Sequence, residues 1–343
     1  MNSKTKYIIK SDGGLGNQMF EYAWARAMQQ LYGGEIWLDA HTYKKKGAYR
    51  DLSLMHFNLN KDVHVVETIV DRMMLYFAAA RKRITDRLFK NRTQESYLNK
   101  IRWGVYNQYS HSAFDCFIEP KRRINYVNGS WFGECFFEPA KEVIKKEFTV
   151  KTPPSDLSLK LITELQSCES VCIHVRLGDF LIEPWNSISR VCGNRYYNEA
   201  IRIIKEKVKN PVFYVFSNRP KDFEYFKTHF ELNASLKLMN FSNPDYEDLR
   251  LMYNCKHMIM SNSTYSWWAQ YLIPNPNKVI VAPCMLNKHN KWDISAEYLP
   301  TWVIVGPEYL DLEGMSATKE MHTLAPSISW ERVEKAYEKI KKA

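Results

Sequence analysis

The sequence predicts an α/β protein built from two doubly wound domains. Strand-like and helix-like segments alternate along the chain, a polar stretch with two prolines at 151–156 interrupts them, and 343 residues are ample for two cores. Strands that alternate with helices form a parallel sheet with helices on its faces. We therefore expect an N-terminal domain over 1–150 and a second α/β domain over 157–310.

The first region opens as a βαβ unit, in which a strand, a Gly-rich turn, an Ala- and Met-rich helix and a second strand follow one another. Gly33 and Gly34 end that helix. Basic helices are expected next, and a strand and a helix close the region. The expected elements are a strand at 7–10, a helix at 19–31, a strand at 35–39, helices within 60–105, a strand at 124–127 and a helix over 139–148.

The second region alternates more strictly, and Ser155 or Asp156 offers an N-cap just after the two prolines. A charged amphipathic helix at 327–343 is expected to brace either domain. The expected elements between them are strands at 171–176, 212–217, 236–239, 257–261 and 278–282, and helices at 195–209, 220–229, 246–255 and 264–273.

The chain carries a net charge of +10, and its densest basic stretch, 81–92, holds six cations and one anion. Ile84, Leu88 and Phe89 recur there at helical spacing, which is typical of an amphipathic basic helix. A solvated helical face is the default interpretation. Contact with an anionic membrane surface comes second, and nucleic-acid binding, which we do not expect, comes third.

The sequence predicts neither a membrane helix nor a signal peptide. No run approaches the ~18 apolar residues of a membrane helix, and the first residues lack the apolar core of a signal peptide. Seven cysteines without a Cys-x-x-Cys pair argue against a disulfide framework or a zinc knuckle. We expect a cytoplasmic protein, and peripheral contact at the inner face of the membrane through 81–92 is the second interpretation of that stretch.

The most informative segment is the strand at 171–176 with the turn that follows it. His174 and Arg176 are two residues apart, so on a strand they project from one face, and Gly178 then permits a turn that brings in Asp179. Ligands of open α/β sheets bind at the carboxyl ends of strands, and an Arg there suits phosphate. The alternative is a buried strand in which Arg176 and Asp179 pair with each other.

A Gly-rich turn follows the first strand and has glycines at 13, 14 and 16. Its free backbone N–H groups at a helix start favour an anion, and Asn17 and Gln18 would add side-chain donors. The third glycine of a dinucleotide fingerprint is missing at the required offset, so an oxidoreductase is not favoured. A plain strand–helix turn is the alternative.

Two further clusters open helices in the second region. The carboxylates of 245–248 suit a purine with a ring N–H and an exocyclic amine, such as guanine, although helix-dipole stabilisation alone would explain them. The hydroxyl and amide side chains of 261–266 suit a pyrophosphate, although Ser and Thr are also ordinary caps. The chain has no Asp-x-Asp pair and no metal-ligand spacing, so we expect arginine and amides, not a metal, to neutralise a nucleotide-diphosphate leaving group.

Three segments resemble, in order, the signatures of the α-1,2-fucosyltransferase family (family 11 glycosyltransferases), in its bacterial type. They are Gly13-Gly-Leu-Gly-Asn-Gln-Met-Phe-Glu-Tyr-Ala23, the segment 173–180 and the segment 248–268. Leu177 stands where the family often has a second arginine. The resemblance implies a GT-B fold of two Rossmann-like domains facing a cleft, with the acceptor on the N-terminal side and GDP-fucose on the C-terminal side. It also implies metal-independent, inverting transfer of L-fucose from GDP-β-L-fucose to the 2-hydroxyl of a terminal β-galactose, with no cofactor.

The resemblance also implies roles for individual residues. Arg176 would contact the diphosphate, His174 and Asp248 would approach guanine, and Asn17 would lie near the reacting bond. The remaining donor-site residues would be Gly14, Gly16, Ser217, Asn218, Asn262, Ser263 and Thr264.

The chemistry of the side chains suggests candidates for the general base and for the acceptor contacts. Asp179 is the first candidate for the base, ahead of Glu183 and His174, because the acceptor hydroxyl loses its proton late and needs no strong base. A role of Asp179 in orienting Arg176 stays open. Aromatic rings stack on sugars, and the expected acceptor contacts are Trp131, Phe132 and Trp185.

Other functions remain open at this point. A fucosyltransferase of another linkage and a GDP-sugar- or glycan-binding protein without turnover are the alternatives. The acceptor is a galactose-terminated oligosaccharide or a lipid-linked glycan, and the sequence does not distinguish them.

Overall fold

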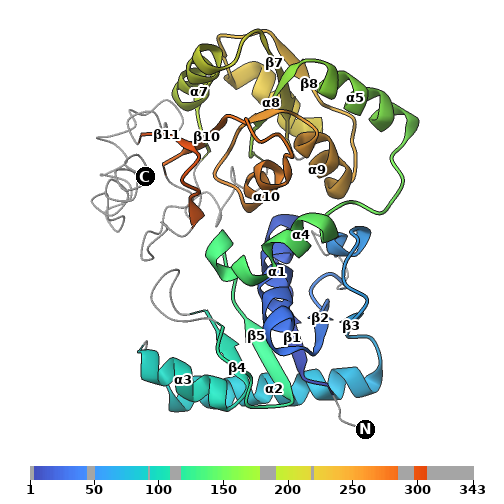
Figure 1. The fold of residues 1–343 in the computed structure, drawn as a ribbon, viewed down its shortest axis with the longest axis vertical. Coiled ribbons are helices and arrows are strands. Elements are labelled where there is room, and N and C mark those ends of the chain that lie inside the picture. Colours follow the sequence, from blue (N-terminus) through green and yellow to red (C-terminus); the bar gives the residue numbers. More distant parts are fainter. Residues whose placement is uncertain are drawn as a thin grey trace. The chain divides into compact units, whose positions relative to one another are not determined.

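The computed structural model describes residues 4–44, 51–91, 93–108, 117–177, 191–217, 220–284 and 297–306. The chain divides into two compact units, Met1–Lys151 and Thr152–Ala343, each with its own parallel sheet (Figure 1). The predicted fold class of two parallel α/β domains is therefore confirmed. The expectations for Asp179, Glu183, Trp185, Asn218 and the helix at 327–343 lie outside the described residues.

The sheet of unit 1 has the order β3-β2-β1-β5-β4, and every pairing in it is parallel. From β1 the chain builds outward through β2 and β3, crosses to the opposite edge of the sheet with β4, and then places β5 between β4 and β1. The direction of chain order thus reverses between β1 and β5. The strands are β1 (Lys6–Lys10), β2 (Glu35–Asp39), β3 (Val63–Val65), β4 (Val105–Asn107) and β5 (Ile124–Asn128).

Helices cover this sheet because their sequences supply apolar faces. α1 (Leu15–Tyr32) is rich in Ala, Met and aromatic residues and is buried over most of its length. Gly33 ends it with a φ of 68°, and its N–H donates to the Gln29 carbonyl at 2.9 Å. The other helices of unit 1 are α2 (Ile69–Leu88), α3 (Gln94–Arg102), α4 (Lys141–Glu147) and the short 3₁₀ turns Ser53–His56, Glu134–Phe136 and Glu138–Ala140.

Unit 2 contains a six-stranded parallel sheet with the order β11-β10-β9-β6-β7-β8. Here the order reverses between β6 and β9, because the chain goes from β6 to β7 and β8 before β9 returns to the opposite side of β6. The strands are β6 (Glu169–His174), β7 (Pro211–Phe216), β8 (Leu236–Leu238), β9 (His257–Ile259), β10 (Ile280–Pro283) and β11 (Val303–Val305). The helices are α5 (Asp156–Ser167), α7 (Asn194–Lys207), α8 (Pro220–His229), α9 (Asp245–Tyr253) and α10 (Thr264–Leu272).

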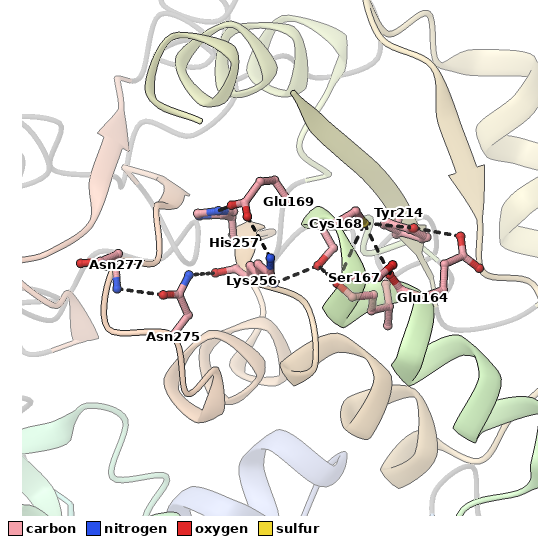
Figure 2. A network of polar contacts seen from close by, with 11 residues as sticks. Glu164, Ser167, Cys168, Glu169, Tyr214, Lys256, His257, Asn275 and Asn277 are labelled. Atoms are coloured by element: carbon pink, nitrogen blue, oxygen red, sulfur yellow. Dashed lines mark hydrogen bonds and ion pairs between the residues drawn. The ribbon is translucent and has the colours of Figure 1, made fainter. Parts of the chain in front are cut away.

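Polar contacts fix the amino-terminal ends of the central strands of unit 2 (Figure 2). The Glu169 carboxylate accepts from Lys256 Nζ at 2.8 Å and pairs with His257 Nε2 at 3.0 Å, and these two hydrogen bonds lower the pKa of Glu169. His257 Nδ1 accepts the Val279 N–H at 3.0 Å, so the ring proton sits on Nε2 and points to Glu169. This network holds β6, β9 and the approach to β10 together at their amino-terminal ends.

The structure corrects the expectation for the basic stretch 81–92. Its helix begins at Ile69 and ends at Leu88, Phe89 is the half-buried C-cap residue, and Arg92 lies outside the described residues. Arg81 is not a surface cation: its guanidinium donates to the carbonyls of Trp103 at 3.1 Å and Ile124 at 2.6 Å. Among the helices in the described ranges, none combines the length and apolar content needed to cross a bilayer.

Candidate active site

The carboxyl ends of β6 and β9 lie side by side at the reversal point of the second sheet. Ile173 is in register with Ile259, so the last residue of β6 and the residues after it, 174–176, meet the residues after β9, 260–264, at the same edge. In open α/β sheets this reversal point is where ligands bind, because the connections leave it in opposite directions. Two of the three motif segments therefore come together from parts of the sequence more than 80 residues apart.

A buried cluster of polar side chains joins these two strand ends. His174 Nδ1 lies 2.5 Å from Ser266 Oγ and 2.9 Å from Ser261 Oγ, and the Tyr197 hydroxyl donates to the His174 carbonyl at 2.9 Å. His174 is only 1% exposed. Its ring therefore links β6 to α10 within the unit, and Ser266, one of the hydroxyls of the predicted cluster 261–266, contacts this ring instead of facing a ligand.

Arg176 stands two residues beyond β6 and is half-buried between the fully buried Val175 and Leu177. The backbone that carries it is fixed by β7. The Val175 N–H donates to the Phe216 carbonyl at 2.8 Å, and the Ser217 hydroxyl donates to the Val175 carbonyl at 2.8 Å. Ser217 thus positions the segment that bears Arg176 through its own hydrogen bond.

The start of α10 brings further polar groups to the same edge. Ser263 is the N-cap, and its side chain accepts the Tyr265 N–H at 3.3 Å, while Thr264 is the first helical residue and is half-buried. Asn262 is buried and accepts from the Cys192 thiol at 3.8 Å. Backbone N–H groups at a helix start favour an anion, so this element can hold phosphate oxygens next to Arg176.

Asp248 supplies a carboxyl group on α9. Burial and the nearby Asp245 and Glu247 raise the pKa of Asp248 to about 7, although a hydrogen bond from Asn243 Nδ2 at 2.9 Å acts in the opposite direction. Tyr265 lies between this carboxyl and His174: its ring centroid is 5.5 Å from that of His174, and its hydroxyl donates to the Asp245 carbonyl at 2.5 Å. Sequence reasoning missed Asn243, which precedes α9.

Unit 1 presents a separate set of residues at its own reversal point. The Gly-rich turn follows β1, and Gly13 adopts a φ of 81°, which favours glycine. Its N–H donates to Asp12 Oδ1 at 2.9 Å. Gly14 is the N-cap of α1, Gly16 is buried in its first turn, and the half-buried Asn17 donates its N–H to the Gly14 carbonyl at 2.9 Å.

Two buried side chains of α1, Gln18 and Glu21, lie next to the Gly-rich turn. Gln18, expected to be a ligand donor, is fully buried: its amide donates to the Asp51 carbonyl at 2.8 Å and accepts the Leu54 N–H at 3.1 Å. That expectation is wrong, because both ends of the amide are used within the unit. Glu21 accepts the Asp12 N–H at 3.4 Å, and burial raises the pKa of its carboxyl well above the ordinary value. Sequence reasoning missed Glu21 as a neighbour of the turn. The signal that could have identified it is a lone acidic residue in an otherwise apolar stretch of α1.

The loop after β5 lies beside the turn on the other side of the reversal point. Trp131 has a φ of 53°, is 2% exposed, and stacks on Trp24 with ring centroids 4.4 Å apart. Gln108 Oε1 accepts the N–H groups of Ser130 and Trp131 at 2.8 and 2.7 Å. The expectation that Trp131 contacts the acceptor is therefore wrong, because its ring is part of the core. Phe132 is half-buried, 5.2 Å from the Phe20 ring.

The site residues thus form two sets, one in each unit. The set of unit 1 is Gly14, Gly16 and Asn17, and the set of unit 2 is His174, Arg176, Ser217, Asp248, Asn262, Ser263 and Thr264. Each set lies where the order of its parallel sheet reverses.

Comparison with known proteins decides the family. The sequence profile described as Glycosyl transferase family 11 matches residues 7–306. The chain belongs to this family. It is a glycosyltransferase of the α-1,2-fucosyltransferase family, as the three motifs predicted.

Relatives of this family 11 chain come from bacteria and mammals. It is 28% identical over 292 residues to an α-1,2-colitosyltransferase of Escherichia coli, with 80% of this chain and 90% of the relative covered. It is 24% identical over 324 residues to the galactoside α-(1,2)-fucosyltransferase 1 of Mus musculus, with 90% of this chain and 74% of the relative covered.

Among solved structures, the chain is similar to fucosyltransferase NodZ from Bradyrhizobium, at 14% identity and a TM-score of 0.43, with 79% of this chain and 95% of the other covered. It is also similar to the heptosyltransferase WaaC of E. coli with ADP, at 12% identity and a TM-score of 0.39, with 97% and 99% covered.

Proposed function

We propose that this family 11 protein transfers L-fucose from GDP-β-L-fucose, with inversion, to the 2-hydroxyl of a terminal β-galactose in a glycan. One observation carries the proposal: Arg176 and the start of α10, with Ser263 and Thr264, lie together at the reversal point of the second sheet. A permanent cation beside backbone N–H groups suits the two phosphoryl groups of GDP.

The leaving group gains negative charge as the fucosyl–oxygen bond breaks. Arg176 and the amides of α10 are fixed before the reaction, so they stabilise that charge without reorganising. Their backbone is held by Ser217 and by the cluster of His174 with its two serines. This leaves His174 a positioning role beneath the nucleotide, and it makes Asp248 the group that accepts from the ring N–H and amine of guanine.

The acceptor side belongs to unit 1 in this proposal. Asn17 is assigned a place near the reacting bond, and Gly14 and Gly16 keep their assignment to the donor, which can approach the backbone at the start of α1. Asp179 is the proposed general base, with Glu183 as the second candidate. Metal ions have no role, because Arg176 and the amides neutralise the diphosphate.

The test combines a variant with a metal chelator. Arg176→Ala should lower kcat for fucose transfer to a β-galactoside by about 100- to 1,000-fold, the usual cost of removing one oxyanion donor. The wild-type rate should be unchanged in excess EDTA. Far-UV circular dichroism and the unfolding midpoint establish that the variant is folded. Unchanged GDP release by Arg176→Ala, or loss of wild-type activity in EDTA that manganese restores, would overturn the proposal.

Three alternatives are separated by further measurements on the same protein. The relative named as an α-1,2-colitosyltransferase favours a second donor, GDP-colitose. A higher kcat/KM for GDP-colitose than for GDP-fucose would select it. Analysis of the product linkage distinguishes transfer to the 2-hydroxyl from another linkage, and GDP binding without donor consumption would identify a binding protein.

A further inference from the structure

Helix α2 has two apolar faces, and only one of them packs against the sheet of unit 1. On the inner face, Met74, Leu75, Ala78 and Ala79 pack against the core cluster that contains Ile8 and Tyr126. The opposite side of α2 is exposed. This is unusual for a helix on a globular unit, which normally pairs one apolar stripe with one polar face.

The outward face consists of large apolar side chains that recur every three, four or seven residues, so they form one stripe along the helix. More than half of the large hydrophobic side chains exposed in the described part of the chain belong to it. Their exposed fractions range from 47% to 76%. The outward face comprises Ile69, Val70, Met73, Tyr76, Phe77, Ile84 and Leu88.

Cations border this outward face. Arg72, Arg83 and Arg87 are exposed. Arg83 and Arg87 follow Arg72 by eleven and fifteen residues, close to three and four full turns, so the three arginines form one row beside the apolar stripe. The two acidic residues of α2 are engaged elsewhere. Asp71 closes the capping box with Thr68, and Asp86 accepts from Lys82 and from Lys100, each at 2.6 Å.

We propose that the outward face of α2 docks on an anionic lipid surface. A row of exposed arginines beside a stripe of Ile, Met, Tyr, Phe and Leu matches the two components of such a surface, which are negative headgroups and the acyl boundary below them. Arginine and aromatic side chains also suit the interfacial depth, because their polar ends stay hydrated while their apolar parts are buried.

Two other occupants fit the outward face less well. A second copy of the chain would pair the face with itself, and the arginine rows would then meet with no acidic side chain of the face between them. A nucleic acid would satisfy the arginines through its phosphates, but it would leave Ile69, Val70 and Met73 in water. The lipid surface is independent of the proposed reaction, since none of these residues belongs to the candidate active site.

The experiment is co-sedimentation of the full chain with vesicles of phosphatidylcholine alone or with 30 mol% phosphatidylglycerol, a composition of about one anionic lipid in three. The wild type should bind the anionic vesicles at least tenfold more strongly than the neutral ones. The double variants Tyr76→Ser/Phe77→Ser and Arg83→Ser/Arg87→Ser should each lose at least tenfold in binding to the anionic vesicles. Both pairs are exposed, so the unfolding midpoint and the rate on a soluble acceptor should stay at wild-type values.

A matched control is Leu157→Ser/Leu159→Ser, which removes two exposed apolar side chains from α5, 46% and 50% exposed, and should leave vesicle binding unchanged. Wild-type chain that stays in the supernatant with anionic vesicles overturns the proposal, as does equal loss in the control. A concentration-dependent dimer that only the outward-face variants abolish would instead assign the face to a second copy. Binding to DNA or RNA that is lost with the arginines but kept by Tyr76→Ser/Phe77→Ser would assign it to nucleic acid.

Discussion

Single residues set the chemistry of the proposed donor side, and the carboxyl of Asp248 is the group there whose pKa is raised toward neutral pH. Its burial, with a smaller contribution from the neighbouring Asp245 and Glu247, raises the pKa of this carboxyl to about 7. Guanine offers two N–H donors, which the ionised carboxylate accepts and the protonated carboxyl does not. Binding of the base should therefore require loss of this proton.

The pH dependence of guanosine binding tests this role of Asp248. Guanosine is the suitable ligand because it has no phosphate group whose own titration would affect the result. With a pKa near 7, the apparent affinity for guanosine should be about tenfold weaker at pH 6 than at pH 8, since one proton is released on binding. Calorimetry across this range measures it. Asp248→Asn should bind weakly and without this slope, whereas Asp245→Asn should keep the slope and move it to lower pH. A flat wild-type profile would contradict the role of Asp248.

Gly13 offers a second prediction at this scale. A Cβ at Gly13 would lie 2.5 Å from Asn17 Nδ2, and the φ of 81° adds backbone strain, so Gly13→Ala should cost about 1–2 kcal/mol and displace Asn17. Gly33→Ala is the control, because it has a φ of 68° with nothing within 4 Å of the new Cβ. Both variants should lose similar stability in urea unfolding, and only Gly13→Ala should lose transfer activity. Equal activity in the two variants would remove Asn17 from the mechanism.

Sequence reasoning located the motif residues but not the state of each side chain. Arg176 and the helix start at Ser263 were found because strand ends and caps have local signatures. Trp131 was misjudged because its burial depends on Trp24, which lies more than 100 positions earlier in the chain, and no local pattern records that stacking. Gln18 was misjudged for the same reason, since its partners are in the segment 51–54.

Elements are held together in unit 1 by a buried ion pair between α1 and α4. Arg26 Nε donates to Glu147 Oε1 at 2.9 Å, the Tyr22 hydroxyl donates to Oε2 at 2.5 Å, and both charged residues are buried. A buried pair is costly to break, because the remaining charge keeps no partner of opposite sign.

Glu147→Ala should accordingly lower the free energy of unfolding by about 3–5 kcal/mol. The control on the same helix is Glu142→Ala, which removes an exposed carboxylate 3.1 Å from Lys145 and should cost less than about 1 kcal/mol. Urea denaturation followed by tryptophan fluorescence gives both values. Similar losses in the two variants would show that the Arg26–Glu147 pair does not stabilise the junction of α1 and α4.

Elements with a clear periodicity or an apolar run were predictable from sequence, including β8 and β9 with three residues each, and other short strands were not. The helices α1, α7, α8, α9 and α10 and the strands β1, β2, β5, β6 and β7 all overlap their predicted ranges, because each has a clear periodicity or an apolar run. The strands β3, β4 and β11 have three residues each and went unpredicted. Three residues are too few to display an alternation, and their extended state comes from the neighbouring strand in the sheet.

At the scale of the whole molecule, each unit has its own sheet and its own set of site residues. If the donor belongs to unit 2, GDP should stabilise that unit in particular. At a GDP concentration of 100 times Kd, the hydrogen-exchange rate should fall by about 100-fold for those amides of unit 2 that exchange only when the bound unit opens.

Hydrogen exchange followed by mass spectrometry can test this assignment peptide by peptide. Protection should be greatest in peptides that cover 171–177 and 260–266, and ADP at the same concentration should give much less, because it lacks the guanine edge that Asp248 recognises in our proposal. Protection that is strongest over β2 and β3 of unit 1 would show that our proposal assigns the nucleotide to the wrong unit.

Both sheets end in very short strands. The outermost ones, β3 and β4 in unit 1 and β8 and β11 in unit 2, each have three residues. An unpaired strand edge is a template on which another chain can add, and a three-residue edge offers too few backbone groups for stable growth. The protein should therefore resist amyloid-type association at high expression levels, even though its strand cores are rich in Val, Ile and aromatic residues.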